Sequence, residues 1–145
     1  MLQRLLELPL PVVGVADGPA TVHSEYLLLA DVHIASERAT YGDQPHPAFG
    51  ITGGDGLHVV WEEIVGTARA KWLLWTGEQI DAQTALQWGV VSEVVPHEHA
   101  LERGIEIAPC PGGQPPRPGV APKRFRRGLA RAAPIEPRRS SHACS

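Results

Sequence analysis

The chain has 145 residues, 16 acidic and 13 basic side chains, and a formal net charge of −3. This length suits a single domain with a modest hydrophobic core. No stretch is long and apolar enough to span a bilayer, residues 1–18 lack the pattern of a secretory signal, and both cysteines follow residue 108. We therefore expect a cytoplasmic protein with no disulfide framework and no membrane partner.

The net charge conceals two segments of opposite sign. Residues 1–108 carry 5 Lys/Arg and 15 Asp/Glu, whereas residues 109–145 carry 8 Lys/Arg and 1 Asp/Glu. The first segment holds all four Trp and nearly all the patterned apolar sequence, and the second holds 8 of the 14 Pro. We predict a partial α/β domain over residues 1–108 and a disordered, unpatterned basic tail over residues 109–145.

The basic tail allows two interpretations. Such a composition can bind nucleic acid, but Phe125 is the only aromatic residue after position 108, so stacking on bases has little support and we expect no nucleic-acid partner. A change of reading frame in GC-rich coding DNA would also produce a run rich in Ala, Arg, Gly and Pro.

Predicted helices and strands alternate along residues 1–108, which indicates an α/β fold. Helical spacing or an N-cap signal predicts helices over residues 2–8, 24–30, 56–65, 67–75, 82–88 and 97–108. Short apolar runs predict strands over residues 12–16, 31–35, 39–41 and 90–95. Glycine and proline predict a turn at 17–19 and a loop over 42–56. All four tryptophans stand at helical spacing and are expected in the core: Trp61, Trp72, Trp75 and Trp88.

Two histidines and an aspartate lie near glycine-rich turns. His46 and Asp55 belong to the predicted loop, and His23 precedes the short helix predicted at 24–30. Such groups can supply a general base, its orienting partner and a second proton donor. Each also has a structural alternative: an exposed loop histidine, a helix N-cap, or a histidine bonded to the start of a helix. No metal or other cofactor is required, and glycines without a lysine do not make a phosphate loop.

Residues 11–96 resemble the crotonase family, also called the enoyl-CoA hydratase/isomerase superfamily. The resemblance is carried by GPATVHSEYLLLAD, IASERATYG and LLWTGEQIDAQTALQWGVVSEVVP, almost without a gap. It implies a crotonase-like spiral of ββα units with two roughly perpendicular sheets, usually assembled as a homotrimer or a dimer of trimers. It also implies an oxyanion hole of two backbone N–H groups, one of them at Val22 and His23.

The resemblance further implies that family segments lie beyond both ends of the chain. The second oxyanion donor belongs to a part of the family sequence that precedes this chain. The C-terminal helices that usually complete the site and the trimer have no counterpart here either. We therefore expect a fragment, truncated at both ends.

Departures from the hydratase pattern indicate a particular branch. Glu25 matches the first catalytic glutamate of the hydratases, but His46 replaces the second, and His23 stands where they carry a glycine. The pattern of His23, His46 and Asp55 resembles the 6-oxocamphor hydrolase-like β-diketone hydrolases, which match these three positions. The resemblance implies retro-Claisen hydrolysis of a small carbonyl compound. His46 would activate water, Asp55 would orient His46, and His23 would stabilise and protonate the enolate.

Two alternatives remain open. The first is an acyl-CoA hydratase or isomerase, with Glu25 as the acid/base and a coenzyme A thioester as substrate. The second is an inactive remnant, because the chain lacks part of the family active site and would expose sheet edges and apolar surface.

Overall fold

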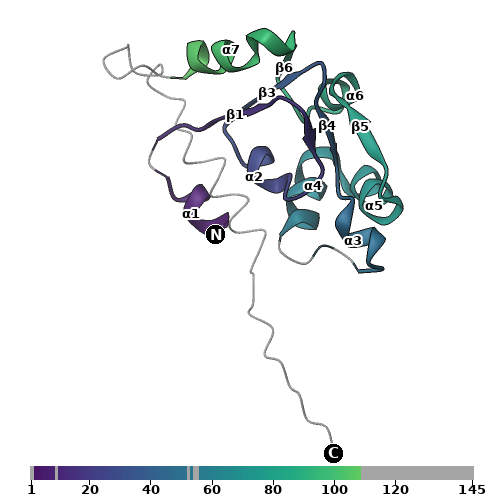
Figure 1. The fold of residues 1–145 in the computed structure, drawn as a ribbon. Helices are drawn as coiled ribbons and strands as arrows, with labels where there is room; N and C mark the ends of the chain where they lie inside the picture. Colours follow the sequence, from purple (N-terminus) through teal and green to yellow (C-terminus); the bar gives the residue numbers. More distant parts are fainter. Residues whose placement is uncertain (1, 9, 52, 54–55, 109–145) are drawn as a thin grey trace, which may run out of the picture.

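The computed structural model describes residues 2–8, 10–51, 53 and 56–108, shown in colour in Figure 1. The disorder predicted for residues 109–145 and the role predicted for Asp55 lie outside the described residues. Within the described part, no helix has both the length and the apolar character needed to cross a membrane.

Helices and strands alternate along the described chain (Figure 1). The helices are α1 (Leu2–Leu6), α2 (Glu25–Leu28), α3 (Pro45–Ala48), α4 (Leu57–Val65), α5 (Thr67–Thr76), α6 (Ala82–Gln87) and α7 (Ala100–Ile107), which the 3-10 turn η1 (His97–His99) precedes. The strands are β1 (Val13–Ala16), β2 (Pro19–Ala20), β3 (Val32–Ser36), β4 (Thr40–Gly42), β5 (Gln79–Asp81) and β6 (Glu93–Val95). The elements β1-β2-α2 and β3-β4-α3 form two successive ββα units, as expected.

The strands form two three-stranded sheets. One has the order β1-β3-β6 and is parallel throughout, with Val13 opposite Val32 and Ile34 opposite Glu93. The other has the order β2-β4-β5, in which β4 pairs parallel with β2 and antiparallel with β5. Each ββα unit contributes its first strand to one sheet and its second strand to the other. This arrangement confirms the crotonase-like α/β architecture.

Three predictions about local structure were wrong. The loop expected at 42–56 contains α3, because Pro45 at the first helical position has its φ preset for a helix and needs no N–H partner there. Pro19–Ala20 forms β2 rather than a turn, and β5 was not predicted. Strands of two or three residues carry too little periodicity to be read from sequence.

The hydrophobic core lies between the sheets and the helices α4 and α5. Trp61, Tyr41 and Leu73 are fully buried there. Trp61 therefore agrees with its predicted core position, but Trp72 and Trp75 are 47% and 68% exposed, so the prediction is wrong for these two. They lie on the outer side of α5, where indole rings pack beside cationic side chains such as Lys71.

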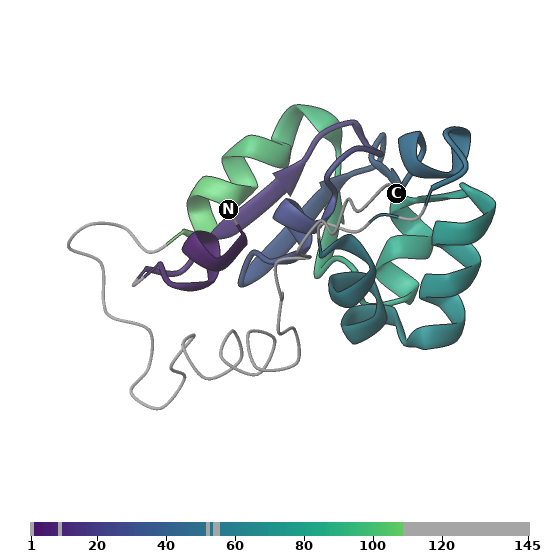
Figure 2. The ribbon, with the colours of Figure 1, turned by 90° about the horizontal axis from the view of Figure 1, so that it is seen from below.

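Helix α7 packs on β1, which Figure 2 shows running alongside it. A Cβ atom added at Gly104 would lie 2.4 Å from Cγ2 of Val15, so only a glycine lets the helix approach so closely. Nε of Arg103 also donates to the carboxylate of Glu93 on β6, at 3.2 and 3.1 Å. These contacts fix α7 to both outer strands of the parallel sheet.

Candidate active site

His23 stands at the turn between β2 and α2, with an unusual backbone. Its φ is 54°, in the left-handed region, and it is the only described residue other than glycine with a positive φ. This conformation costs a side-chain-bearing residue about 1–2 kcal/mol, whereas glycine adopts it freely. The geometry agrees with the expectation that His23 occupies a position where related sequences carry glycine. Strain of this kind is concentrated at functional sites.

His23 contacts the buried carboxylate of Glu25. Nδ1 of His23 lies 2.9 Å from Oε1 of Glu25. The Glu25 side chain is 1% exposed, and that of His23 is 49% exposed. Oε2 of Glu25 is buried and makes no hydrogen bond within the described part of the chain. Burial of an oxygen without a hydrogen bond costs free energy. A ligand that donates a hydrogen bond to Oε2 of Glu25 would remove this cost.

His46 contacts a different carboxylate, that of Asp43. Nδ1 of His46 lies 2.7 Å from Oδ1 and 2.9 Å from Oδ2 of Asp43. The two residues are three positions apart at the start of α3, and their side chains are 23% and 2% exposed, respectively. Because an ionised carboxylate only accepts hydrogen bonds, Nδ1 is the donor. In the neutral imidazole, Nε2 is then the bare nitrogen.

Gly53 closes one side of the His46–Asp43 pair. A Cβ atom at Gly53 would lie 3.4 Å from both Nδ1 of His46 and Oδ2 of Asp43, and 3.0 Å from Cδ2 of Leu57. Its carbonyl oxygen in turn lies 3.1 Å from Nδ1 of His58, in the first turn of α4. Gly53 thus lies directly against the pair, and its contact with His58 ties it to α4.

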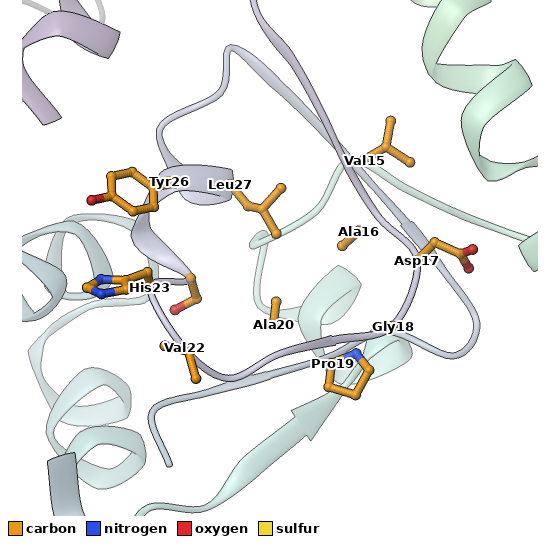
Figure 3. Close-up of a pocket in the computed structure, with 11 residues that line it drawn as sticks. Val15, Ala16, Asp17, Gly18, Pro19, Ala20, Val22, His23, Tyr26 and Leu27 are labelled. Carbon is orange, nitrogen blue, oxygen red and sulfur yellow. The ribbon is translucent and has the colours of Figure 1, made fainter. Parts of the chain in front are cut away.

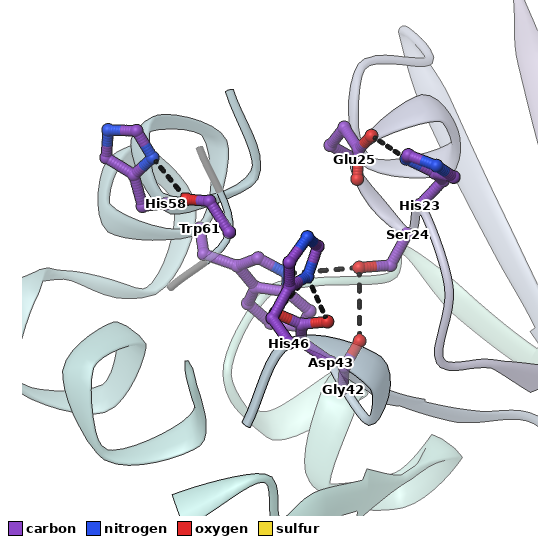
Figure 4. A network of polar contacts seen from close by, with 9 residues as sticks. His23, Ser24, Glu25, Gly42, Asp43, His46, His58 and Trp61 are labelled. Carbon is purple, nitrogen blue, oxygen red and sulfur yellow. Dashed lines mark hydrogen bonds and ion pairs between the residues drawn. The ribbon is translucent and has the colours of Figure 1, made fainter. Parts of the chain in front are cut away.

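Buried hydrogen bonds join the segments that carry the two pairs (Figure 4). Nε1 of Trp61 donates to Oγ of Ser24 at 3.1 Å, and Oγ of Ser24 donates to the carbonyl oxygen of Gly42 at 3.4 Å. The backbone N–H of Gln44 donates to the carbonyl oxygen of Thr21 at 3.1 Å. Since Ser24 lies between His23 and Glu25 in sequence, and Gly42 precedes Asp43, these bonds hold both pairs on one connected scaffold.

Strand β4, which leads to Asp43, is fixed by a second buried contact. Oη of Tyr41 lies 3.2 Å from Nε2 of His33 on β3, and the two rings pack edge to face. Burial lowers the pKa of His33 to about 4, and burial raises the pKa of the Tyr41 hydroxyl. Both groups are therefore neutral at neutral pH and form part of the core.

An open pocket of about 510 Å³ lies beside His23 (Figure 3). The residues that line it come from β1, β2 and the start of α2: Val15, Ala16, Asp17, Gly18, Pro19, Ala20, Val22, His23, Ser24, Tyr26 and Leu27. The lining is mixed: His23 and Tyr26 lie near one end, the carboxylate of Asp17 lies near the other, and apolar side chains such as Ala20 and Leu27 lie between them. Among the described residues, no group of three His, Cys, Asp or Glu side chains could hold a metal ion.

The structure describes three of the four predicted catalytic residues, His23, Glu25 and His46. It pairs His23 with Glu25, and His46 with Asp43. The predicted partner of His46, Asp55, lies outside the described residues, so its role stays a prediction. Sequence reasoning missed Asp43, and the available signal was an acidic residue three positions before His46 at a helix start. Ser24 and Gly53 gave no such signal, because their contacts come from distant elements.

These features agree with a match to a known family. Residues 1–110 match the model of the enoyl-CoA hydratase/isomerase family. Together with the two sheets and the successive ββα units, this match places the chain in that family, the crotonase superfamily.

Individual relatives give the same result. The chain is 35% identical over 109 residues to an enoyl-CoA isomerase/hydratase of Mycosarcoma maydis, a match that covers 74% of this chain and 40% of the relative. It is 36% identical over 107 residues to a short-chain-enoyl-CoA hydratase of Clostridium acetobutylicum, with coverages of 73% and 41%. The chain thus spans about two fifths of the length of these curated relatives.

Among solved structures, the chain is similar to a β-diketone hydrolase from the cyanobacterium Anabaena, bound to (S)-3-oxocyclohexyl acetic acid. The TM-score is 0.77 with 38% sequence identity, over 89% of this chain and 50% of the hydrolase. An enoyl-CoA hydratase/isomerase from Cupriavidus metallidurans gives a TM-score of 0.70 with 32% identity, over 74% and 40% of the two chains.

Proposed function

We propose that the protein hydrolyses a C–C bond of a small, cyclic β-diketone in a retro-Claisen reaction. One observation carries the proposal: a histidine, His46, stands where hydratases carry their second glutamate, and a buried carboxylate holds its Nδ1. This arrangement leaves Nε2 as a general base, as in serine hydrolase triads. The similarity to the Anabaena β-diketone hydrolase supports the same branch of the family.

The proposed reaction begins with activation of water. Nε2 of His46 takes one proton from a water molecule while its oxygen attacks one carbonyl carbon of the diketone. The tetrahedral intermediate then breaks the bond to the carbon that lies between the two carbonyls, and that electron pair forms an enolate on the second carbonyl. The products, after the enolate carbon is protonated, are a carboxylic acid and a ketone, which are a single keto acid when the diketone is cyclic.

His23 and its backbone serve the second half of the reaction in this proposal. Backbone N–H groups at Val22 and His23 stabilise the enolate oxygen, as in other oxyanion holes. The His23 ring donates the proton to the enolate carbon, and its contact with Glu25 orients that ring. Exchange with solvent water returns the proton from His46 to bulk and restores His23. The pocket beside His23 combines apolar side chains with a few polar groups, which suits a small ring that carries carbonyl groups.

A second candidate function rests on Glu25. Its Oε2 is buried and unbonded among the described residues, and Glu25 matches the first catalytic glutamate of the hydratases. An acyl-CoA hydratase or isomerase would use this oxygen as an acid/base toward a coenzyme A thioester. The names of the curated relatives favour this reaction class.

The deciding experiment incubates the full chain with a bicyclic β-diketone in oxygen-18 water, without coenzyme A. We expect a keto acid with one solvent oxygen in its carboxyl group, and we expect its formation to be lost in His46→Ala. A parallel incubation uses a short enoyl-CoA thioester, whose hydration would depend on Glu25 and would be lost in Glu25→Gln. Hydration without diketone cleavage would support the second candidate. Turnover of neither substrate would overturn both and favour the inactive alternative.

We also propose a cytoplasmic location, which the sequence predicts, whereas the resemblance predicts a homotrimer for the intact family protein rather than for this chain. Sedimentation velocity of the purified chain tests the assembly, because a trimer and a monomer of a 15.6 kDa chain differ threefold in mass. Fractionation of the source cells tests the location.

A further inference from the structure

We infer that Asp43 is a positioning residue that orients His46 and fixes its proton on Nδ1, a role that the sequence prediction did not give it. This inference concerns the machinery of the proposed hydrolysis and rests on it for its catalytic meaning. Its structural basis, the contact of both Asp43 oxygens with one ring nitrogen, stands independently.

The first argument is the exclusive use of Nδ1. Both carboxylate oxygens of Asp43 contact this nitrogen, at 2.7 and 2.9 Å. A neutral imidazole has one donor nitrogen and one acceptor nitrogen, so a carboxylate at Nδ1 leaves only Nε2 to take the water proton. A second carboxylate hydrogen-bonded to Nε2 would block the base. Asp43 therefore fixes the proton on Nδ1 and leaves Nε2 free to act as the base.

The second argument is burial. The side chain of Asp43 is 2% exposed, whereas that of His46 is 23% exposed. In the protein interior, a charge interaction is screened far less than on the surface. When Nε2 takes a proton, the resulting imidazolium therefore gains more from this carboxylate than it would from an exposed one.

The third argument is rigidity. Pro45 and Pro47 flank His46 and restrict the backbone on both sides. The backbone N–H of Ile51 donates to the carbonyl oxygen of His46 at 3.0 Å. Gly53 lies against both side chains of the His46–Asp43 pair. A base held this way loses little freedom when it binds a water molecule, which is the purpose of a positioning residue.

The test is the position of the proton on His46, measured by long-range proton–nitrogen NMR of the full chain above the pH at which histidines titrate. The His46 signals are those that disappear in His46→Ala. We expect the proton on Nδ1 in the wild type and in Asp55→Asn. In Asp43→Asn we expect it on Nε2, because the asparagine amide can donate to Nδ1, a wrong-tautomer effect known for triads. Asp43→Glu should keep the wild-type tautomer.

Glu102→Gln is the matched control. Glu102 is also three residues from a histidine, His99, at 3.6 Å, but both side chains are exposed. This variant should leave the His46 signals unchanged. The inference is overturned if Asp43→Asn keeps the proton on Nδ1, or if Asp55→Asn moves it. Should Asp43→Asn not fold, the wild-type and Asp55→Asn spectra still decide between the two carboxylates.

Steady-state kinetics of the same variants connects the tautomer of His46 with turnover. With the β-diketone substrate, Asp43→Asn should lower kcat by about 10³–10⁴-fold and leave KM nearly unchanged, as expected for loss of base orientation. Equal loss in Asp43→Glu would indicate a purely structural role and contradict the inference. If the wild type shows no diketone cleavage, the proposed function fails, while the NMR result still determines which residue orients His46.

Discussion

The two histidine–carboxylate pairs of this protein are built in opposite ways. In the first, the carboxylate of Glu25 is buried with one oxygen unbonded among the described residues, and the His23 ring is half-exposed on a left-handed turn. In the second, both oxygens of Asp43 contact one nitrogen of His46, two prolines flank His46 in sequence, and Gly53 lies against the pair.

The difference indicates a division of tasks. A ring fixed at one nitrogen offers the other nitrogen in a constant direction, which suits a base that must meet a small water molecule. A half-exposed ring can exchange its proton with solvent, which suits a donor that must be recharged after every turnover. Four predictions test this comparison, from the largest expected effect to the smallest.

Removal of the second pair's base should have the largest effect. We expect His46→Ala to lower diketone cleavage by about 10⁴-fold, the upper end of the usual contribution of a general base. His99→Ala, an exposed histidine outside the site, serves as the matched control and should change the rate little. Initial rates of keto acid formation measure both variants. Equal rates for His46→Ala and the wild type would remove His46 from the mechanism.

Among the described residues, no carboxylate contacts a third histidine, His33. Protonation of His33 should have the next largest effect, on stability. Burial lowers its pKa from 6.5 to about 4, so the unfolded chain binds more protons than the folded chain between these values. Stability should therefore fall as the pH drops from 6.5 towards 4, by about 3 kcal/mol in total. Urea unfolding of the wild type and His33→Phe across this range checks it. The two pH profiles should diverge, and parallel profiles would contradict the assignment.

Loss of the bridge between the pairs should cost somewhat less. Trp61→Phe removes the bond from Nε1 to Oγ of Ser24 and leaves space in the core, which should lower the free energy of unfolding by about 2 kcal/mol. Trp75→Phe, at a site that is 68% exposed, should stay within about 0.5 kcal/mol of the wild type. Urea denaturation measures the free energy of unfolding of both variants. Equal losses would show that the Trp61–Ser24 hydrogen bond does not stabilise the fold.

The smallest change is one methyl group beside the second pair. In Gly53→Ala, the added Cβ would press on Leu57, His46 and Asp43, at a cost of about 1 kcal/mol. The NMR signals of His46 should shift, and those of His23 should not. Shifts of similar size at both histidines would show that the pairs are not independent.

Much of this site could be predicted from sequence, and the rest could not for physical reasons. The resemblance marked His23, Glu25 and His46, because each replaces or retains a residue at a recognisable motif position. Asp43 was missed although it lies three positions before His46, because this spacing permits a contact between the two side chains without requiring it.

The same limit applied to the fold. The longer helices α4, α5 and α7 and the strands β1 and β3 follow from periodicity. The two-residue β2 and three-residue β5 exist only because both pair with β4, which lies between them. Such pairing between segments distant in sequence leaves no local pattern. Trp72 and Trp75 are three residues apart, a spacing that core positions of a helix also have. They nevertheless lie on the outer face of α5, whereas Leu73 and Leu74 between them are buried.

The parallel sheet β1-β3-β6 also has a consequence for the order in which this chain can fold. None of its strand pairs can form as a hairpin, and β6 joins β3 only after α4, α5 and α6 have been synthesised. Pairings between such distant segments form slowly, because a long loop must close before any contact compensates for it. During synthesis on the ribosome, β3 therefore keeps one edge unpaired until β6 has been made. Ile34 and its neighbours form the exposed segment that a chaperone would bind first.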